Sequence, residues 1–253
     1  MAHLSKKNIP PEERLIFALD VPTVEDAHNL VEELGNSVQF YKLGLELFMA
    51  GGYYELIDWM RARGKKIFVD LKFFDVPETV RSAVRQLKGR GISFATVHSG
   101  NSSILRAAAR EKGDVKILAV TVLTSIDQSD IDADTGIKGA VQVNDLVVSR
   151  AARALEAGCD GVISSGLEAP GLREKLGPDF TIITPGIRPV EKSLTCPEPQ
   201  RRQNIDDQKR TVDIEEAFNN GADYIVVGRP IKNAPDRKAA AEAIQKRIAA
   251  IFK

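Results

Sequence analysis

Cysteine, histidine and long apolar runs are all scarce in this chain of 253 residues. The two cysteines, Cys159 and Cys196, and the three histidines do not have the spacing of a metal-binding motif. Their scarcity argues against a zinc site and against a disulfide framework. No stretch approaches the roughly 20 apolar residues of a transmembrane helix, and the N-terminus lacks the apolar core of a signal peptide. We therefore expect a soluble, cytoplasmic protein.

The chain also lacks net charge, because 35 lysines and arginines balance 35 aspartates and glutamates. Nucleic-acid-binding domains carry a basic patch or stripe, and here there is no basic run and no interleaved aromatic stripe. We therefore expect neither a nucleic-acid nor a membrane partner. An anionic ligand would have to be met by a few cations placed locally.

Short apolar runs recur along the chain, each with the length and composition of a buried strand. The chain is 43% hydrophobic, which is enough to bury a large core. Its length and eight strand-like runs predict the α/β class, as a (β/α)8 TIM barrel that forms a single domain over residues 1–253 with a short N-terminal arm at 1–12. The eight runs are 14–19, 38–43, 66–71, 92–97, 115–122, 161–163, 180–183 and 224–227.

Segments with helical periodicity lie between these runs, and glycines mark their ends. A glycine just after a helix is typical of a C-terminal cap. A doubly wound sheet is the alternative fold, but the chain has nothing like its glycine-rich nucleotide fingerprint. The helical segments are 24–34, 53–63, 77–88, 102–112, 144–157 and 214–219, and the glycines are Gly35, Gly64, Gly91, Gly113, Gly158 and Gly221.

Residues 69–80, V-D-L-K-F-F-D-V-P-E-T-V, carry the densest charge at any strand end. Side chains alternate along a strand, so Asp70 and Lys72 should point the same way, with Asp75 in the turn that follows. A purely structural interpretation is also open. Asp75 could cap the next helix with Glu78 as a capping box, and Asp70 and Lys72 could form a solvated strand end.

The other strands also end in polar residues, and in a barrel all these ends meet on the face where active sites form. Asp20 either caps the first helix or belongs to the site. Lys42 lies in an apolar run, which predicts a charged partner. His98 is expected to be structural. The loops T-P-G-I-R-P at 184–189 and V-G-R-P at 227–230 have the glycine and arginine of a phosphate site.

Four motifs together resemble the bacterial type of the orotidine 5′-phosphate decarboxylase family. They are D-L-K-F-F-D-V-P-E-T, V-T-V-L-T-S, T-P-G-I-R-P and V-G-R-P, and the resemblance runs from about residue 14 to 251. It implies conversion of orotidine 5′-monophosphate to uridine 5′-monophosphate, the last step of pyrimidine nucleotide synthesis, without metal or cofactor. It also implies a homodimer with shared sites.

The resemblance assigns roles residue by residue. Lys42, Asp70, Lys72 and Asp75 would form the catalytic array, with Asp75 and Thr79 reaching into the partner's site. The substrate contacts would be Asp20, Lys42, Asp70, Lys72, Asp75, Thr79, Thr124, Arg188, Gln208, Gly228 and Arg229.

One segment departs from the family. Residues 189–207 form a longer loop than the family has, and we expect it to act as a lid. Gln200, Gln203 and Gln208 could each meet the phosphate. We choose Gln208 because D-D-Q-K-R runs directly into a helix start.

Two other functions remain open at this stage. Related sugar-phosphate decarboxylases and aldolases reuse the Asp-x-Lys-x-x-Asp strand end with a magnesium ion, although V-P-E-T and the glutamine-bearing loop favour the nucleotide enzyme. A non-catalytic barrel that binds a phosphate ligand would explain Arg188 and Arg229. It would not explain two lysines interleaved with two aspartates.

Overall fold

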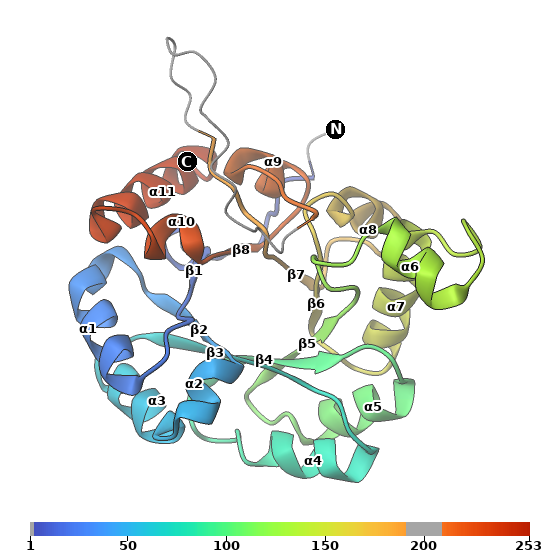
Figure 1. The fold of residues 1–253 in the computed structure, drawn as a ribbon, viewed down its shortest axis with the longest axis horizontal. Helices are drawn as coiled ribbons and strands as arrows, with labels where there is room; N and C mark the ends of the chain where they lie inside the picture. Colours follow the sequence, from blue (N-terminus) through green and yellow to red (C-terminus); the bar gives the residue numbers. More distant parts are fainter. Residues whose placement is uncertain (1–2, 191–208) are drawn as a thin grey trace.

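The computed structural model describes residues 3–190 and 209–253, and these residues form a closed barrel of parallel strands. Each strand pairs with the next in the chain, and β1 closes the ring against β8 (Figure 1). The predicted (β/α)8 barrel is confirmed. The strands are β1 (Leu15–Ala18), β2 (Phe40–Leu43), β3 (Lys66–Phe73), β4 (Ile92–His98), β5 (Lys116–Val120), β6 (Gly161–Ile163), β7 (Thr181–Thr184) and β8 (Tyr224–Val227).

Helices surround the barrel, and none of those described is long and apolar enough to cross a membrane (Figure 1). Each predicted helix is present to within three residues at either end. The helices are α1 (Val24–Leu34), α2 (Leu45–Ala50), α3 (Tyr53–Ala62), α4 (Pro77–Arg85), α5 (Ser102–Glu111), α6 (Gln128–Thr135), α7 (Val143–Glu156), α8 (Ala169–Leu176), α9 (Ile214–Asn219), α10 (Arg229–Lys232) and α11 (Arg237–Ile251), with short 3-10 turns η1 (Pro11–Glu13) and η2 (Gly35–Ser37).

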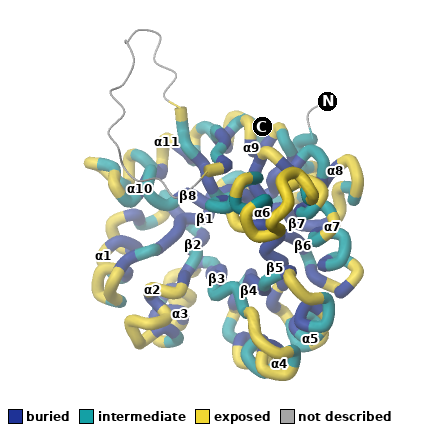
Figure 2. Tube along the Cα trace, turned by 45° about the vertical axis from the view of Figure 1, so that its right-hand side comes forward, coloured by how far each residue is buried: buried dark blue, intermediate teal, exposed yellow. Residues whose placement is uncertain are grey.

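The barrel interior is filled by large apolar side chains. Phe40 stacks on Phe94 with ring centroids 5.2 Å apart, and Tyr224 packs edge-on against both rings. The outward-facing strand residues pack against the helices in a second, larger cluster. The strands are accordingly buried, whereas α6 and its loop are largely exposed (Figure 2). A packed interior leaves room for a ligand only at an end of the barrel.

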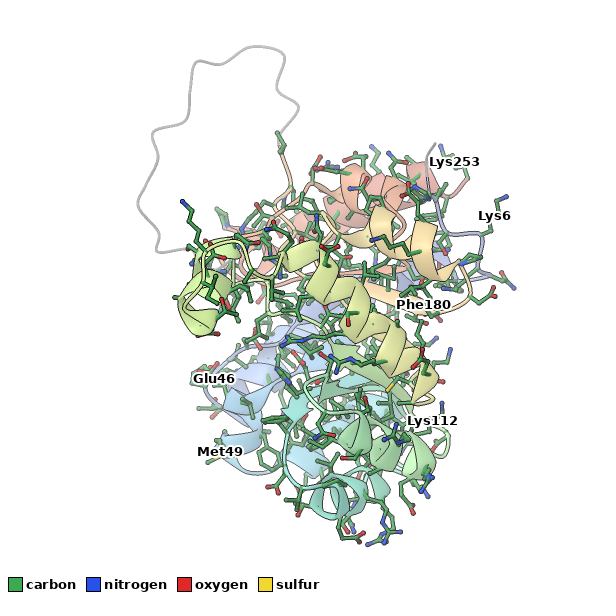
Figure 3. The ribbon with its side chains drawn as sticks, turned by 90° about the vertical axis from the view of Figure 1, so that its right-hand side faces the viewer. Lys6, Glu46, Met49, Lys112, Phe180 and Lys253 are labelled. Atoms are coloured by element: carbon green, nitrogen blue, oxygen red, sulfur yellow. The ribbon has the colours of Figure 1, made fainter. Side chains whose placement is uncertain are left out.

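The two ends of the barrel differ in role. Figure 3 looks across the barrel, with Glu46 and Met49 at the end where the strands finish and Lys6, Lys112 and Phe180 at the opposite end.

All six glycines predicted to end helices have positive φ, for example 71° at Gly64 and 107° at Gly221, where a Cβ would be strained.

Two capping interpretations are wrong. Thr23, not Asp20, caps α1, and its hydroxyl accepts the Asp26 N–H at 3.0 Å. Helix α4 begins after Val76 without a side-chain cap. Glu78 pairs with Arg81 at 2.7 Å instead of completing a capping box. Neither Asp20 nor Asp75 therefore caps a helix.

Candidate active site

A cavity of about 600 Å³ opens at the end of the barrel where the strands finish. Eight of the predicted site residues line it, and they come from strands or loops distributed around the ring. The fold therefore brings them together. They are Asp20, Lys42, Asp70, Lys72, Thr124, Arg188, Gly228 and Arg229.

Four charged side chains of alternating sign form a row along one wall of this cavity. The Lys42 Nζ lies 3.1 Å from an Asp20 oxygen and 3.4 Å from an Asp70 oxygen. The Lys72 Nζ lies 2.9 Å from the same Asp70 oxygen. Lys42 thus has the partners predicted for a charge inside an apolar run. The interpretation of Asp70 as a solvated strand end is wrong, because Asp70 is only 8% exposed.

Two members of the row, Asp70 and Lys42, have pKa values shifted toward their charged forms. Burial alone raises the pKa of Asp70, but the charges of Lys42 and Lys72 and the hydrogen bonds from Lys72 and Thr96 outweigh it, so the pKa lies below its usual range. Burial alone lowers the pKa of Lys42, and Asp70 and Asp20 outweigh it in turn, so that pKa is raised. The charged forms of Asp70 and Lys42 are therefore stabilised by their neighbours in the row.

The cavity also carries cations at the loops after β7 and β8. Gly186, with a φ of 77°, and Arg188 follow β7, and Gly228 and Arg229 follow β8. A Cβ at position 228 would stand 3.3 Å from the Ala18 Cβ, so glycine keeps the backbone close to β1. Backbone N–H groups together with arginine forks suit a phosphate.

The loop that carries Thr124 is bonded to Arg210, whose guanidinium also forms a buried ion pair. The Arg210 Nη1 meets Glu168 at 2.5 Å, and its Nη2 donates to the carbonyls of Val122 and Leu123 at 3.1 and 3.0 Å. The backbone N–H of Lys209 donates to the Thr124 carbonyl at 3.1 Å. The chain at 209–210 therefore fixes the loop after β5.

Two predicted site residues, Asp75 and Thr79, do not line the cavity of this single chain. Asp75 and Thr79 are exposed, beside β3 and on α4, and the Asp75 carboxylate accepts the neighbouring Val76 N–H at 2.6 Å. Gln208 lies outside the described residues, as do the alternatives Gln200 and Gln203 and most of the 189–207 loop.

Sequence reasoning missed Lys232 and Thr96. Lys232 lines the cavity, and its ammonium donates to the Asp20 carbonyl at 2.8 Å. Its spacing from Arg229, one helical turn, is a signal that could have found it. Thr96 contacts Asp70 from β4, and a hydroxyl inside the apolar run F-A-T-V-H was the available signal. His98, expected to be structural, accepts the Gly100 N–H at 3.2 Å.

Residues 13–244 match the orotidine 5′-phosphate decarboxylase / HUMPS family. The chain belongs to this family. It is 57% identical over 249 residues to the orotidine 5′-phosphate decarboxylase of Methylococcus capsulatus, covering 98% of this chain and 97% of the relative. The enzyme of the same name from Xanthomonas euvesicatoria is 49% identical over 239 residues, covering 94% and 93%.

A solved family structure has the same architecture. The orotidine 5′-phosphate decarboxylase of Lactobacillus acidophilus superposes with a TM-score of 0.77 at 35% identity, covering 93% of this chain and 99% of that one. Among the described residues of the present chain, no three His, Cys, Asp or Glu side chains are grouped as metal ligands would be. The family and its fold thus agree with the barrel and with the motifs at its rim.

Proposed function

We propose that this chain decarboxylates orotidine 5′-monophosphate to uridine 5′-monophosphate and carbon dioxide, the last step of pyrimidine nucleotide synthesis. The observation that carries the proposal is the row Asp20, Lys42, Asp70 and Lys72 in one cavity with Arg188. Family membership and relatives of the same name at 57% and 49% identity support it.

The row suits the chemistry. Loss of carbon dioxide leaves an electron pair on pyrimidine carbon 6 with no adjacent group to accept it, so the site must stabilise a carbanion-like centre. Lys72 can do this with its ammonium and then donate the proton that replaces the carboxylate. Asp70, ionised beside the substrate carboxylate, repels it until it leaves. Lys42 holds Asp70 at 3.4 Å and keeps that charge in place.

The rest of the cavity suits the nucleotide. Asp20 and Lys42 bind the ribose hydroxyls, and Thr124 meets the pyrimidine. Arg188, Gly228 and Arg229 bind the phosphate, where arginine offers a fixed fork of donors. Gln208, which lies outside the described residues, is the further phosphate contact that the resemblance implies. The contacts to the phosphate thus bind the substrate at a point remote from the reacting carbon.

The active unit in this proposal is a homodimer, in which Asp75 and Thr79 complete the partner's site. Both residues are exposed in the single chain, and the chain neighbours of Asp75 on either side are exposed apolar residues. Exposed large apolar side chains are typical of a protein interface. Phe74 and Val76 flank Asp75 and are 64 and 62% exposed, and Leu45, Phe48 and Met49 of α2 are 56, 42 and 78% exposed.

Orotidine 5′-monophosphate turnover in the presence of a chelator tests the activity. The expected result is carbon dioxide release at an undiminished rate. A rate abolished by the chelator and restored by magnesium would favour the related sugar-phosphate chemistry. Binding of the nucleotide without turnover would favour a phosphate-binding barrel.

The cytoplasmic location stays a prediction from the sequence.

Subunit mixing tests the shared site. Asp75→Asn and Lys72→Ala should each be inactive, but a mixed dimer contains one site with Lys72 from one chain and Asp75 from the other, both intact. With random exchange about half the dimers are mixed and each has one working site, so about a quarter of wild-type activity should return. If activity does not recover although subunit exchange is demonstrated, Asp75 does not contribute to the partner's site.

A further inference from the structure

The catalytic row sits on an irregular piece of strand β3. Val69 pairs with Ala95 of β4 and Phe73 with Val97, so three residues of β3, Asp70 to Lys72, lie opposite the single residue Thr96. A bulge of this kind re-aims side chains and takes backbone groups out of the ladder. Among the described residues, Lys72 is the only non-glycine with positive φ, at 48°.

Thr96 contacts both ends of this bulge. Its hydroxyl donates to Asp70 Oδ1 at 2.9 Å and accepts the backbone N–H of Lys72 at 2.9 Å. The side chain is fully buried, so no water competes for these bonds. The hydroxyl thus donates to the Asp70 carboxylate and accepts from the backbone N–H of Lys72, a residue within the bulge.

We propose that Thr96 is a positioning residue, which fixes the Asp70 carboxylate and the left-handed backbone of Lys72 in the geometry that decarboxylation requires. This rests on the proposed function, in which Asp70 and Lys72 act on the substrate. The strained φ of Lys72 supports it, because sparsely populated backbone conformations persist only where surrounding contacts hold them. The only side-chain hydrogen bond to the Lys72 N–H among those described comes from Thr96.

The bond also fixes which Asp70 oxygen faces which cation. Oδ1 is taken by Thr96, whereas Oδ2 lies 2.9 Å from Lys72 Nζ and 3.4 Å from Lys42 Nζ. Without the hydroxyl, the carboxylate can rotate about its last torsion, which is broad for aspartate. Rotation would move the charge relative to the reacting carbon, while the residues that bind the phosphate remain unchanged.

Thr96→Val tests the proposal, since valine keeps the shape and removes the hydroxyl. We expect kcat to fall between about 10- and 100-fold, the cost of a small misplacement of reacting groups, with KM within about threefold of wild type. Thr96→Ser restores the hydroxyl and should recover most of kcat. Unchanged kcat in folded Thr96→Val, or no recovery in Thr96→Ser, would overturn the proposal.

Thr121→Val is the matched control. Thr121 is also fully buried near the end of the neighbouring strand, and its hydroxyl donates to the Ile163 carbonyl at 2.9 Å without lining the cavity. Thr121→Val loses one buried hydrogen bond and Thr96→Val loses two, so both variants should unfold at a somewhat lower temperature. Only Thr96→Val should lose kcat when both are assayed well below unfolding. Equal losses would reduce Thr96 to a structural role.

A crystal structure of Thr96→Val separates this proposal from the proposed function, because it needs no turnover. We expect Lys72 to leave the left-handed region or its Nζ to move away from Asp70 Oδ2. Unchanged positions of both would overturn the positioning role even if the wild type is an active decarboxylase. If the wild type releases no carbon dioxide, the proposed function fails, and the crystal structure still decides what Thr96 holds.

Discussion

The barrel end opposite the cavity is stabilised by a buried ionic cluster, and removing its centre should destabilise the fold without touching catalysis. Asp223 lies just before β8 and is fully buried. It lies 2.7 Å from Lys7 Nζ and 2.9 Å from Arg173 Nη2, and it accepts the Ile182 N–H at 2.9 Å. Lys7 belongs to the N-terminal arm, so Asp223 ties the arm to the barrel.

Asp223→Asn keeps the shape and removes the charge. Lys7 and Arg173 then lose their anionic partner, and Arg173 is only 6% exposed. Breaking a buried ion pair in this way costs about 3–5 kcal/mol. For a chain of this size each kcal/mol lowers the unfolding temperature by about 2–4 °C, so a fall of about 6–20 °C is expected.

Thermal unfolding followed by circular dichroism at fixed protein concentration measures this fall. Asp145→Asn is the control, because Asp145 and Lys175 form a pair 3.9 Å apart with side chains 73 and 58% exposed. Such surface pairs contribute about 1 kcal/mol or less. The kcat/KM of folded Asp223→Asn should match wild type. A fall no larger than that of Asp145→Asn, or a large loss of kcat/KM below unfolding, would refute the reasoning.

Two further predictions concern the cavity. Arg229→Ala removes a phosphate anchor, so KM should rise strongly, and kcat should also fall if phosphate binding closes the loop. Steady-state kinetics measure both constants. An unchanged KM would place the phosphate elsewhere. The pH profile tests Asp70, whose pKa lies below its ordinary value of 3.8. A carboxylate with a lowered pKa gives stability that is full above the unfolded pKa and lost as pH falls through the folded one. Asp70 should therefore stay ionised between about pH 5 and 8, so protonation of Asp70 should not lower kcat at saturating substrate in that range. A decrease of kcat toward acid pH within this range, shifted to higher pH in Thr96→Val, would contradict this.

The sequence was sufficient for the barrel because its signals are local. Apolar runs of strand length and glycines at helix ends do not depend on distant contacts, and the glycine positions have the positive φ expected of them. The C-terminal ends of the strands then had to meet on one face. This is why residues as distant as Asp20 and Arg229 could be placed in one cavity without a structure.

The sequence could not predict the local geometry that departs from ideal elements. Strict alternation explains why Asp70 and Lys72 face the same way, but it does not show the bulge opposite Thr96 or the left-handed Lys72. The capping interpretations of Asp20 and Asp75 were wrong for a related reason. A short polar side chain near a helix start satisfies the pattern of a cap, and only the helix's actual first residue decides between neighbours.

The most direct test of the central claim is the effect of Lys72→Ala on turnover and on nucleotide binding, measured in the same preparation. Lys72 would act mainly in the transition state, as carbanion stabiliser and proton donor. The variant should therefore release carbon dioxide from orotidine 5′-monophosphate several powers of ten more slowly than wild type, while it still binds uridine 5′-monophosphate measurably in calorimetry. Near-normal turnover in this variant would remove Lys72 from the centre of the mechanism and contradict the account.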